Sequence, residues 1–174
     1  VHGEVAGALA EMVAGREDEN AALLAHHWEL AGDPMEAAAW ACRAALWSAT
    51  RDLDESSRHW RKVRDLTDSA PPSAESRHLG IMARVQMLNA GMRSGLSEEE
   101  AKTLYEQGAE MSAAEGDKRT LAMLKAAYAI VVGMAGGAEA ALALARESLR
   151  RVDEIGDPSL AVDFRPTQVY LLSN

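Results

Sequence analysis

The chain has 174 residues, of which 48% are hydrophobic, so it is long enough and apolar enough to bury a core. Its formal net charge of −9 disfavours binding to a nucleic-acid backbone, and a single cysteine, Cys42, excludes an intrachain disulfide framework and a cysteine zinc site. The sequence contains no apolar stretch of about 18 residues and no signal peptide, so we expect a cytoplasmic protein without a membrane partner.

Helical periodicity runs through almost the whole chain. Alanine is frequent and aromatic residues make up only 5%, a composition that favours closely packed helices. The one strand-like run, 129–132, is flanked by helical residues. About nine helices are predicted, over 2–14, 18–31, 34–50, 53–68, 74–93, 98–114, 117–134, 138–155 and 158–172.

The predicted helix boundaries carry start and stop signals. Gly32-Asp33-Pro34 ends one helix on glycine and begins the next with a cap and a proline, and Gly156-Asp157-Pro158 has the same residue types. Ser97 followed by Glu100 is a capping box, and Pro71-Pro72 separates the fourth and fifth segments. The short loops favour antiparallel neighbouring helices.

Bulky and small residues recur in three registers. Counted from Ala37, positions 4, 8, 11, 20, 24 and 27 hold Trp40, Ala44, Trp47, Ser56, Trp60 and Val63. Counted from Met82, positions 4, 7, 11, 20, 24 and 27 hold Val85, Leu88, Met92, Ala101, Tyr105 and Gly108. Counted from Ala122, positions 7, 8, 11, 20 and 27 hold Tyr128, Ala129, Val132, Ala141 and Ser148. Small residues mark close helix crossings, and large ones fill the neighbouring hollows.

This pattern resembles the tetratricopeptide repeat (TPR), a helix-turn-helix unit of about 34 residues. Arg43 stands where leucine is usual and Lys125 where tryptophan is usual, and the registers start 45 and 40 residues apart. The resemblance implies antiparallel helix hairpins stacked as a right-handed superhelix. The alternative is an irregular α-helical bundle, because helix patterns alone do not fix topology.

We therefore predict one TPR-like domain over 1–174. It comprises lead-in helices in 1–36, repeats at 37–70, 82–115 and 122–155, and an incomplete next repeat at 158–174. Both ends of the chain look cut, so we expect a fragment of a longer protein. The last segment has apolar residues without a following helix to cover them, which predicts self-association of the isolated fragment.

Three stretches resemble the TPR tail of large bacterial signalling proteins. They are 23–33 (LLAHHWELAGD), 95–117 with SEEEA at 97–101, and 141–158 ending in EIGDP. In that family an AAA-like ATPase joins the tail to a class III adenylate or guanylate cyclase domain or to a helix-turn-helix domain. No nucleotide-binding motif, cyclase metal carboxylate pair or DNA-reading helix of such a parent is recognisable in this sequence.

Polar clusters in the chain have structural explanations. His26 and His27 are adjacent and point about 100° apart on a helix, so a packed histidine is favoured over a zinc ligand. The basic residues Arg58, Arg61, Lys62 and Arg64 are diluted on their helix by acidic residues on either side, Asp54, Glu55, Asp65 and Asp68, which indicates a solvated face rather than a nucleic-acid site. No P-loop or nucleophile elbow occurs, so we expect neither catalysis nor a cofactor.

The resemblance also implies where a partner would bind. TPR domains line their groove with positions 2, 5, 9 and 12 of each first helix. Carried onto the three registers, these positions hold twelve residues. Nine of them are the candidate groove residues, Ala41, Ala45, Ser48, Gln86, Ala90, Arg93, Met123, Ala126 and Ile130, and the other three are Ala38, Ala83 and Gly133. Arg93 is the only cation among them, so we expect a small, apolar surface suited to an amphipathic helix rather than to an acidic C-terminal peptide.

The sequence predicts a non-catalytic scaffold and interaction module of a bacterial signalling ATPase. Its expected partner is a protein, a peptide or another domain of the same chain. The alternative is a superhelix that senses a small ligand and regulates the attached ATPase or output domain. A pocket with buried polar groups would favour the sensor, and a long open groove would favour the scaffold.

Overall fold

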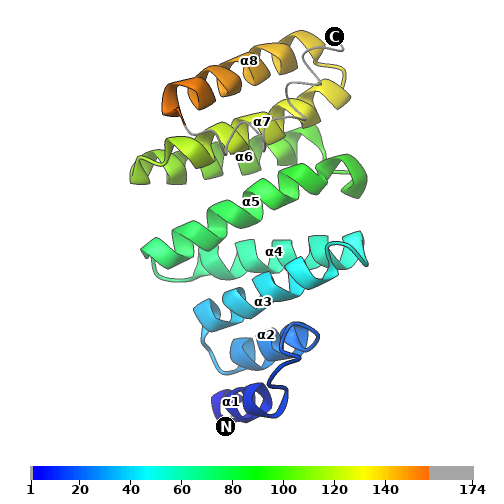
Figure 1. Cartoon of the computed structure of the whole chain (residues 1–174), viewed down its shortest axis with the longest axis vertical. Coiled ribbons are helices and arrows are strands. Elements are labelled where there is room, and N and C mark those ends of the chain that lie inside the picture. Colours follow the sequence, from blue (N-terminus) through cyan, green and yellow to red (C-terminus); the bar gives the residue numbers. More distant parts are fainter. Residues whose placement is uncertain (1, 157–174) are drawn as a thin grey trace. The chain divides into compact units, whose positions relative to one another are not determined.

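The computed structural model describes residues 2–156, and this part of the chain folds into helices without any strand (Figure 1). The helices are α1 His2–Met12, α2 Ala21–Leu30, α3 Pro34–Ser48, α4 Leu53–Ser69, α5 Ala74–Ser94, α6 Glu98–Glu115, α7 Lys118–Met134 and α8 Ala138–Ile155. The prediction of an all-α protein is confirmed, with eight helices in the described residues. The ninth predicted segment, 158–172, lies outside them.

The predicted capping residues begin the helices as expected. The Asp33 side chain accepts a hydrogen bond from the Glu36 amide at 3.1 Å, so α3 starts at Pro34. Ser97 Oγ accepts one from the Glu100 amide at 3.1 Å, and α4 and α7 begin on aspartate caps of the same kind. α6 and α8 each end on a glycine with a φ of +69°, a conformation that glycine adopts without strain.

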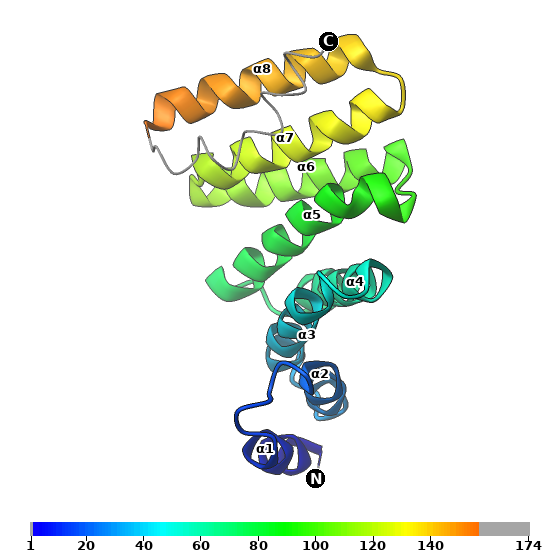
Figure 2. The ribbon, with the colours of Figure 1, turned by 45° about the vertical axis from the view of Figure 1, so that its right-hand side comes forward.

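The helices belong to two compact units, Val1–Ala83 and Arg84–Asn174, whose boundary falls inside α5. In the first unit α1 packs on α2, α2 on α3, and α3 on α4. In the second unit α6 packs on α7 and α7 on α8, and these three helices lie side by side in Figure 2. Within the same unit α5 approaches α7, because a Cβ placed on Gly91 would lie 3.4 Å from Cγ2 of Val131.

The small positions of the three registers are buried in the structure. At position 20, Ser56 is 5% exposed, and the two equivalent alanines are fully buried. Position 27 is buried in each register as well. Two of these residues bond to the first helix of their own hairpin: Ser56 Oγ donates to the Ala45 carbonyl at 2.8 Å, and Ser148 Oγ donates to the Ala122 carbonyl at 2.9 Å. Small side chains thus allow α4 to lie on α3 and α8 to lie on α7.

Each unit has its own hydrophobic cluster. In the first unit Ala37 and Ala38 of α3 meet Leu66 of α4, with Trp28 and Leu79 packed against them. In the second unit, alanines of α7 meet a valine of α8 in an equivalent way; the cluster is Ala122, Ala126 and Val152, bordered by Met123, Leu149 and Ile155. Alanine on the first helix and an aliphatic residue on the second therefore close both hairpins.

The tryptophans of the first unit differ in burial. The positions of the four tryptophans on the helix stripe and in the repeat predict that they are mostly buried, and Trp60, at 4% exposure, is buried. Trp28, Trp40 and Trp47 are half-buried. Two of these rings are covered by neighbouring guanidinium groups, since the Cζ atoms of Arg43 and Arg51 lie 4.6 and 3.9 Å from the ring centroids of Trp40 and Trp47.

Both departures from the repeat pattern have partners within their own unit. Arg43 is exposed above Trp40, and its Nη2 lies 2.8 Å from Oδ1 of Asp18. Lys125 is 7% exposed, and its Nζ lies 2.5 Å from Oε1 of Glu147 on α8. An ion pair therefore takes the place of the usual apolar contact at each position.

Candidate functional site

The structure places the predicted groove residues unevenly. Arg93 is exposed, and Gln86, Ala90, Met123 and Ile130 are half-buried. In contrast, four of the nine are buried: Ala41 and Ala45 at 0%, Ser48 at 5% and Ala126 at 8% exposure. These four side chains pack inside their own unit and present almost no surface to a partner.

The candidates also divide between the units. Ala41, Ala45 and Ser48 follow one another along α3 of the first unit, and the other six lie on α5 and α7 in the second unit. Met123 and Ala126 belong to the cluster that α7 forms with α8. Their side chains therefore contact the second helix of their hairpin. Ser48 is the candidate that also lines the hollow described next.

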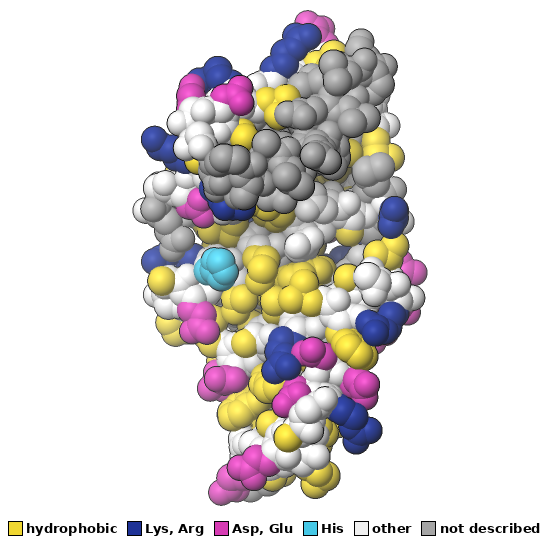
Figure 3. All heavy atoms as spheres, viewed as in Figure 1, with side chains coloured by type: hydrophobic (Ala, Val, Ile, Leu, Met, Phe, Trp, Pro, Cys, Tyr) yellow, Lys and Arg dark blue, Asp and Glu magenta, His cyan; other side chains and the backbone are white. Residues whose placement is uncertain are grey.

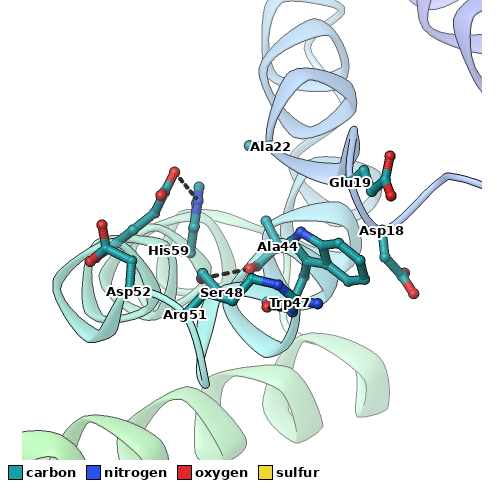
Figure 4. A pocket seen from close by; sticks show the side chains of 10 residues that line it. Asp18, Glu19, Ala22, Ala44, Trp47, Ser48, Arg51, Asp52 and His59 are labelled. Carbon is teal, nitrogen blue, oxygen red and sulfur yellow. Dashed lines mark hydrogen bonds and ion pairs between the residues drawn. The ribbon is translucent and has the colours of Figure 1, made fainter.

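A polar hollow of about 220 Å³ opens in the first unit (Figure 4). It lies where the start of α2, the end of α3 and the first turns of α4 meet. Its lining residues are Asp18, Glu19, Ala22, Ala44, Trp47, Ser48, Arg51, Asp52, Glu55 and His59. In Figure 4 the Trp47 ring lies beside Asp18 and Glu19, and His59 lies on the other side of Ser48. We call this feature the α2–α4 hollow.

Local hydrogen bonds hold the floor of the α2–α4 hollow. Ser48 Oγ donates to the Ala44 carbonyl at 2.8 Å, so the hydroxyl is turned back onto α3. The Asp52 carboxylate accepts from the Glu55 amide at 2.9 Å and caps α4. Arg51 donates from Nη1 to the Trp47 carbonyl at 2.7 Å while its guanidinium covers the indole ring. Arg51 is thereby fixed against the wall.

The lining of the hollow has an acidic excess. Four carboxylates, of Asp18, Glu19, Asp52 and Glu55, face one guanidinium, which gives a net charge of −3 with His59 neutral. His59 Nε2 lies 3.6 Å from Oε1 of Glu55, and burial lowers the pKa of the imidazole although Glu55 opposes that shift. Within the described part of the chain, the Glu19 carboxylate makes no hydrogen bond or ion pair.

Sequence reasoning did not find this hollow. Its residues come from 18–22, 44–48 and 51–59, and although the last two stretches contain residues of the repeat pattern, that pattern does not indicate a hollow there. Their meeting depends on α2 and α4 both packing on α3. The one signal in the sequence is His59, because a histidine at position 23 of its register replaces the leucines, Leu104 and Leu144, of the other two.

Other clusters weighed from the sequence are in structural contacts. The rings of His26 and His27 are 5.9 Å apart and tilted by 59°, and the described residues contain no group of three metal-binding side chains. On the basic face of α4, Lys62 Nζ lies 2.6 Å from Oε2 of Glu29 on α2, and Arg64 pairs with Asp65. Over α1–α3, acidic and basic side chains alternate on the face seen in Figure 3. None of the described helices is long and apolar enough to cross a membrane.

Comparison with known proteins does not assign the chain to a family. No family model matches the chain, and neither does a curated protein or a solved structure. The TPR resemblance and the suggested signalling parent therefore remain predictions from the sequence. The candidate site rests on the geometry of the first unit alone.

Proposed function

We propose that the chain is a non-catalytic protein-interaction module built from TPR-like helix hairpins. The observation that supports it is the repeat chemistry: the small positions 20 and 27 are buried in each of the three registers, although the side chains differ. Stacked hairpins of this kind present an extended surface for a protein segment. From the resemblance we further propose a parent signalling protein with an AAA-like ATPase and a cyclase or DNA-binding output domain.

The α2–α4 hollow is the feature on which the alternative function, a sensor of a small ligand, would depend. Its volume of about 220 Å³ is below the range of about 300–1,000 Å³ that is usual for small-molecule sites. Ser48, the deeply buried polar side chain among its lining residues, already donates to the Ala44 carbonyl. We therefore favour a protein partner over a small-molecule ligand.

A selection experiment separates the two functions. The whole chain is immobilised and exposed to a displayed library of random peptides, and the enriched peptides are resynthesised and titrated. In parallel, a panel of nucleotides, amino acids and sugars is tested for an increase in Tm. A peptide family with a shared motif and saturable binding is expected. A metabolite that raises Tm, together with no enriched peptide, would favour the sensor and overturn the proposal.

A further inference from the structure

The α2–α4 hollow contains side chains that the hairpin itself does not require. Comparing the three registers separates the side chains that the hairpin requires from those that it does not. Asp52 stands at position 16, where Ser97 and Gly137 occupy the same N-cap in the other hairpins, so its role is structural. His59 stands at position 23, where the other registers have Leu104, which is 2% exposed, and Leu144. A hairpin of this type thus closes with leucine at this position, and the histidine makes the wall polar.

The charge of the hollow selects the kind of ligand. Arg51, the cation of the lining, is held against Trp47 by the ring and by the backbone carbonyl. Asp18 is shared with Arg43 at the rim. Glu19 has no partner among the described residues, and with Arg43 counted beside Arg51 the four carboxylates and two guanidinium groups still leave the site a net charge of −2. This negative potential attracts a cation and repels an anion.

The size of the hollow limits the ligand to about one side chain. The volume of about 220 Å³ is too small for a nucleotide, and one wall is the half-buried Trp47 ring. We infer that the α2–α4 hollow binds a basic side chain, arginine or lysine, of the partner protein. This inference rests on the proposed function and specifies the partner's chemistry at one point of contact. Carboxylates at the rim would bind the cationic group, and the part of the indole that Arg51 leaves uncovered would contact its aliphatic stem.

The test uses the whole ¹⁵N-labelled chain and single residues as probes. N-acetyl-arginine methylamide and the lysine equivalent are titrated, and the Trp47 indole N–H signal, assigned with the Trp47→Phe variant, is followed. N-acetyl-citrulline methylamide is the neutral control, because it keeps the shape of arginine without its charge. We expect a saturable shift with both basic probes, weaker at high salt, and none with citrulline.

Variants locate the binding. Glu19→Gln should weaken binding of the arginine probe by about two- to fivefold, the effect of one exposed ion pair, and Glu55→Gln should act in the same direction. Glu36→Gln, an exposed α3 acid outside the hollow, removes the same charge and should leave binding unchanged. Equal shifts with citrulline, or equal weakening by Glu36→Gln, would overturn the inference.

The selected peptides separate this inference from the proposed function. If peptides bind but their motif lacks a basic residue, and Glu19→Gln leaves their affinity intact, the inference fails and the interaction module stands. If no peptide binds but the arginine probe does, the proposed function fails and the cation site stands. The remaining outcome concerns a basic residue of a selected peptide. If its replacement by norleucine weakens binding to the wild-type chain but not to the Glu19→Gln variant, both the proposed function and the cation site are supported.

Discussion

Replacing Trp60 with alanine is the sharpest test of the repeat register. Trp60 is 4% exposed at position 24 of the first hairpin, in the segment that packs on α3. A buried tryptophan removes about 150–250 Å² from water, which at about 25 cal/mol per Å² corresponds to about 4–6 kcal/mol. Because alanine keeps part of that contribution and the cavity relaxes, we expect Trp60→Ala to lower the free energy of unfolding by about 3–5 kcal/mol.

The assay can be confined to the first unit. All four tryptophans lie before Ala83, so indole emission in urea reports on that unit, whereas circular dichroism reports on the whole chain. Trp47→Ala is the matched comparison, because Trp47 is half-buried under Arg51 and should cost about 1–2 kcal/mol. A loss below about 1 kcal/mol for Trp60→Ala, or a larger loss for Trp47→Ala, would refute the assigned register.

Three further predictions concern charged residues of the second unit. Lys125→Met should change the unfolding free energy by less than about 1.5 kcal/mol in urea melts, because Glu147 keeps its contact with Arg151 and methionine fills the space. The Lys125 hydrogen bond lowers the pKa of Glu147, so the carboxylate's contribution is complete above its unfolded pKa of about 4.3 and is lost as the pH falls through the folded value. Between about pH 5 and about pH 3 the unfolding free energy of the wild type should therefore fall further than that of Glu147→Gln. The expected difference is about 1 kcal/mol or less. An acidic C-terminal peptide should bind no better as the free acid than as the amide in calorimetry, and a preference abolished by Arg93→Ala would contradict this.

Local signals predicted the helices well because caps and breakers act over a few residues. Asp33 and Ser97 cap the helices that follow them, and Pro71-Pro72 separates α4 from α5. The start of α2 was predicted at 18, but the helix begins at Ala21 and turns occupy the residues before it. Asp18 lies in those turns and pairs with Arg43 of α3, a contact across 25 residues that no local pattern encodes.

The candidate groove shows a different limit of sequence reasoning. The register assigned Ala41 and Ala45 to the groove by analogy with the family. Nothing in the sequence distinguishes an alanine that lines a groove from one that packs under a helix. In the structure Ser56 of α4 reaches the Ala45 carbonyl, so that stretch of α3 is covered by the second helix. The α2–α4 hollow was equally hidden, because its walls meet only after three helices pack.

Departures from the repeat pattern separate stabilising residues from candidate recognition residues. Arg43 and Lys125 replace apolar residues, but each forms an ion pair shorter than 3 Å within its unit. His59 also replaces an apolar residue, yet its distance to Glu55 is 3.6 Å and burial lowers its pKa. A partly buried histidine whose contact with a carboxylate is as long as 3.6 Å, so that burial still lowers its pKa, is expected to cost stability.

We therefore expect His59→Leu to stabilise the first unit by about 1 kcal/mol at pH 8, since leucine occupies this position in the other two registers. The sign of the pH dependence follows from the lowered pKa: the folded state binds fewer protons, so the wild type loses stability as the pH falls below the unfolded histidine value of about 6.5. The advantage of His59→Leu should thus grow between pH 8 and pH 5, measured by indole emission in urea. Equal stability changes at the two pH values, or destabilisation by the leucine, would show that His59 serves the fold, which would remove the argument that it marks a recognition site.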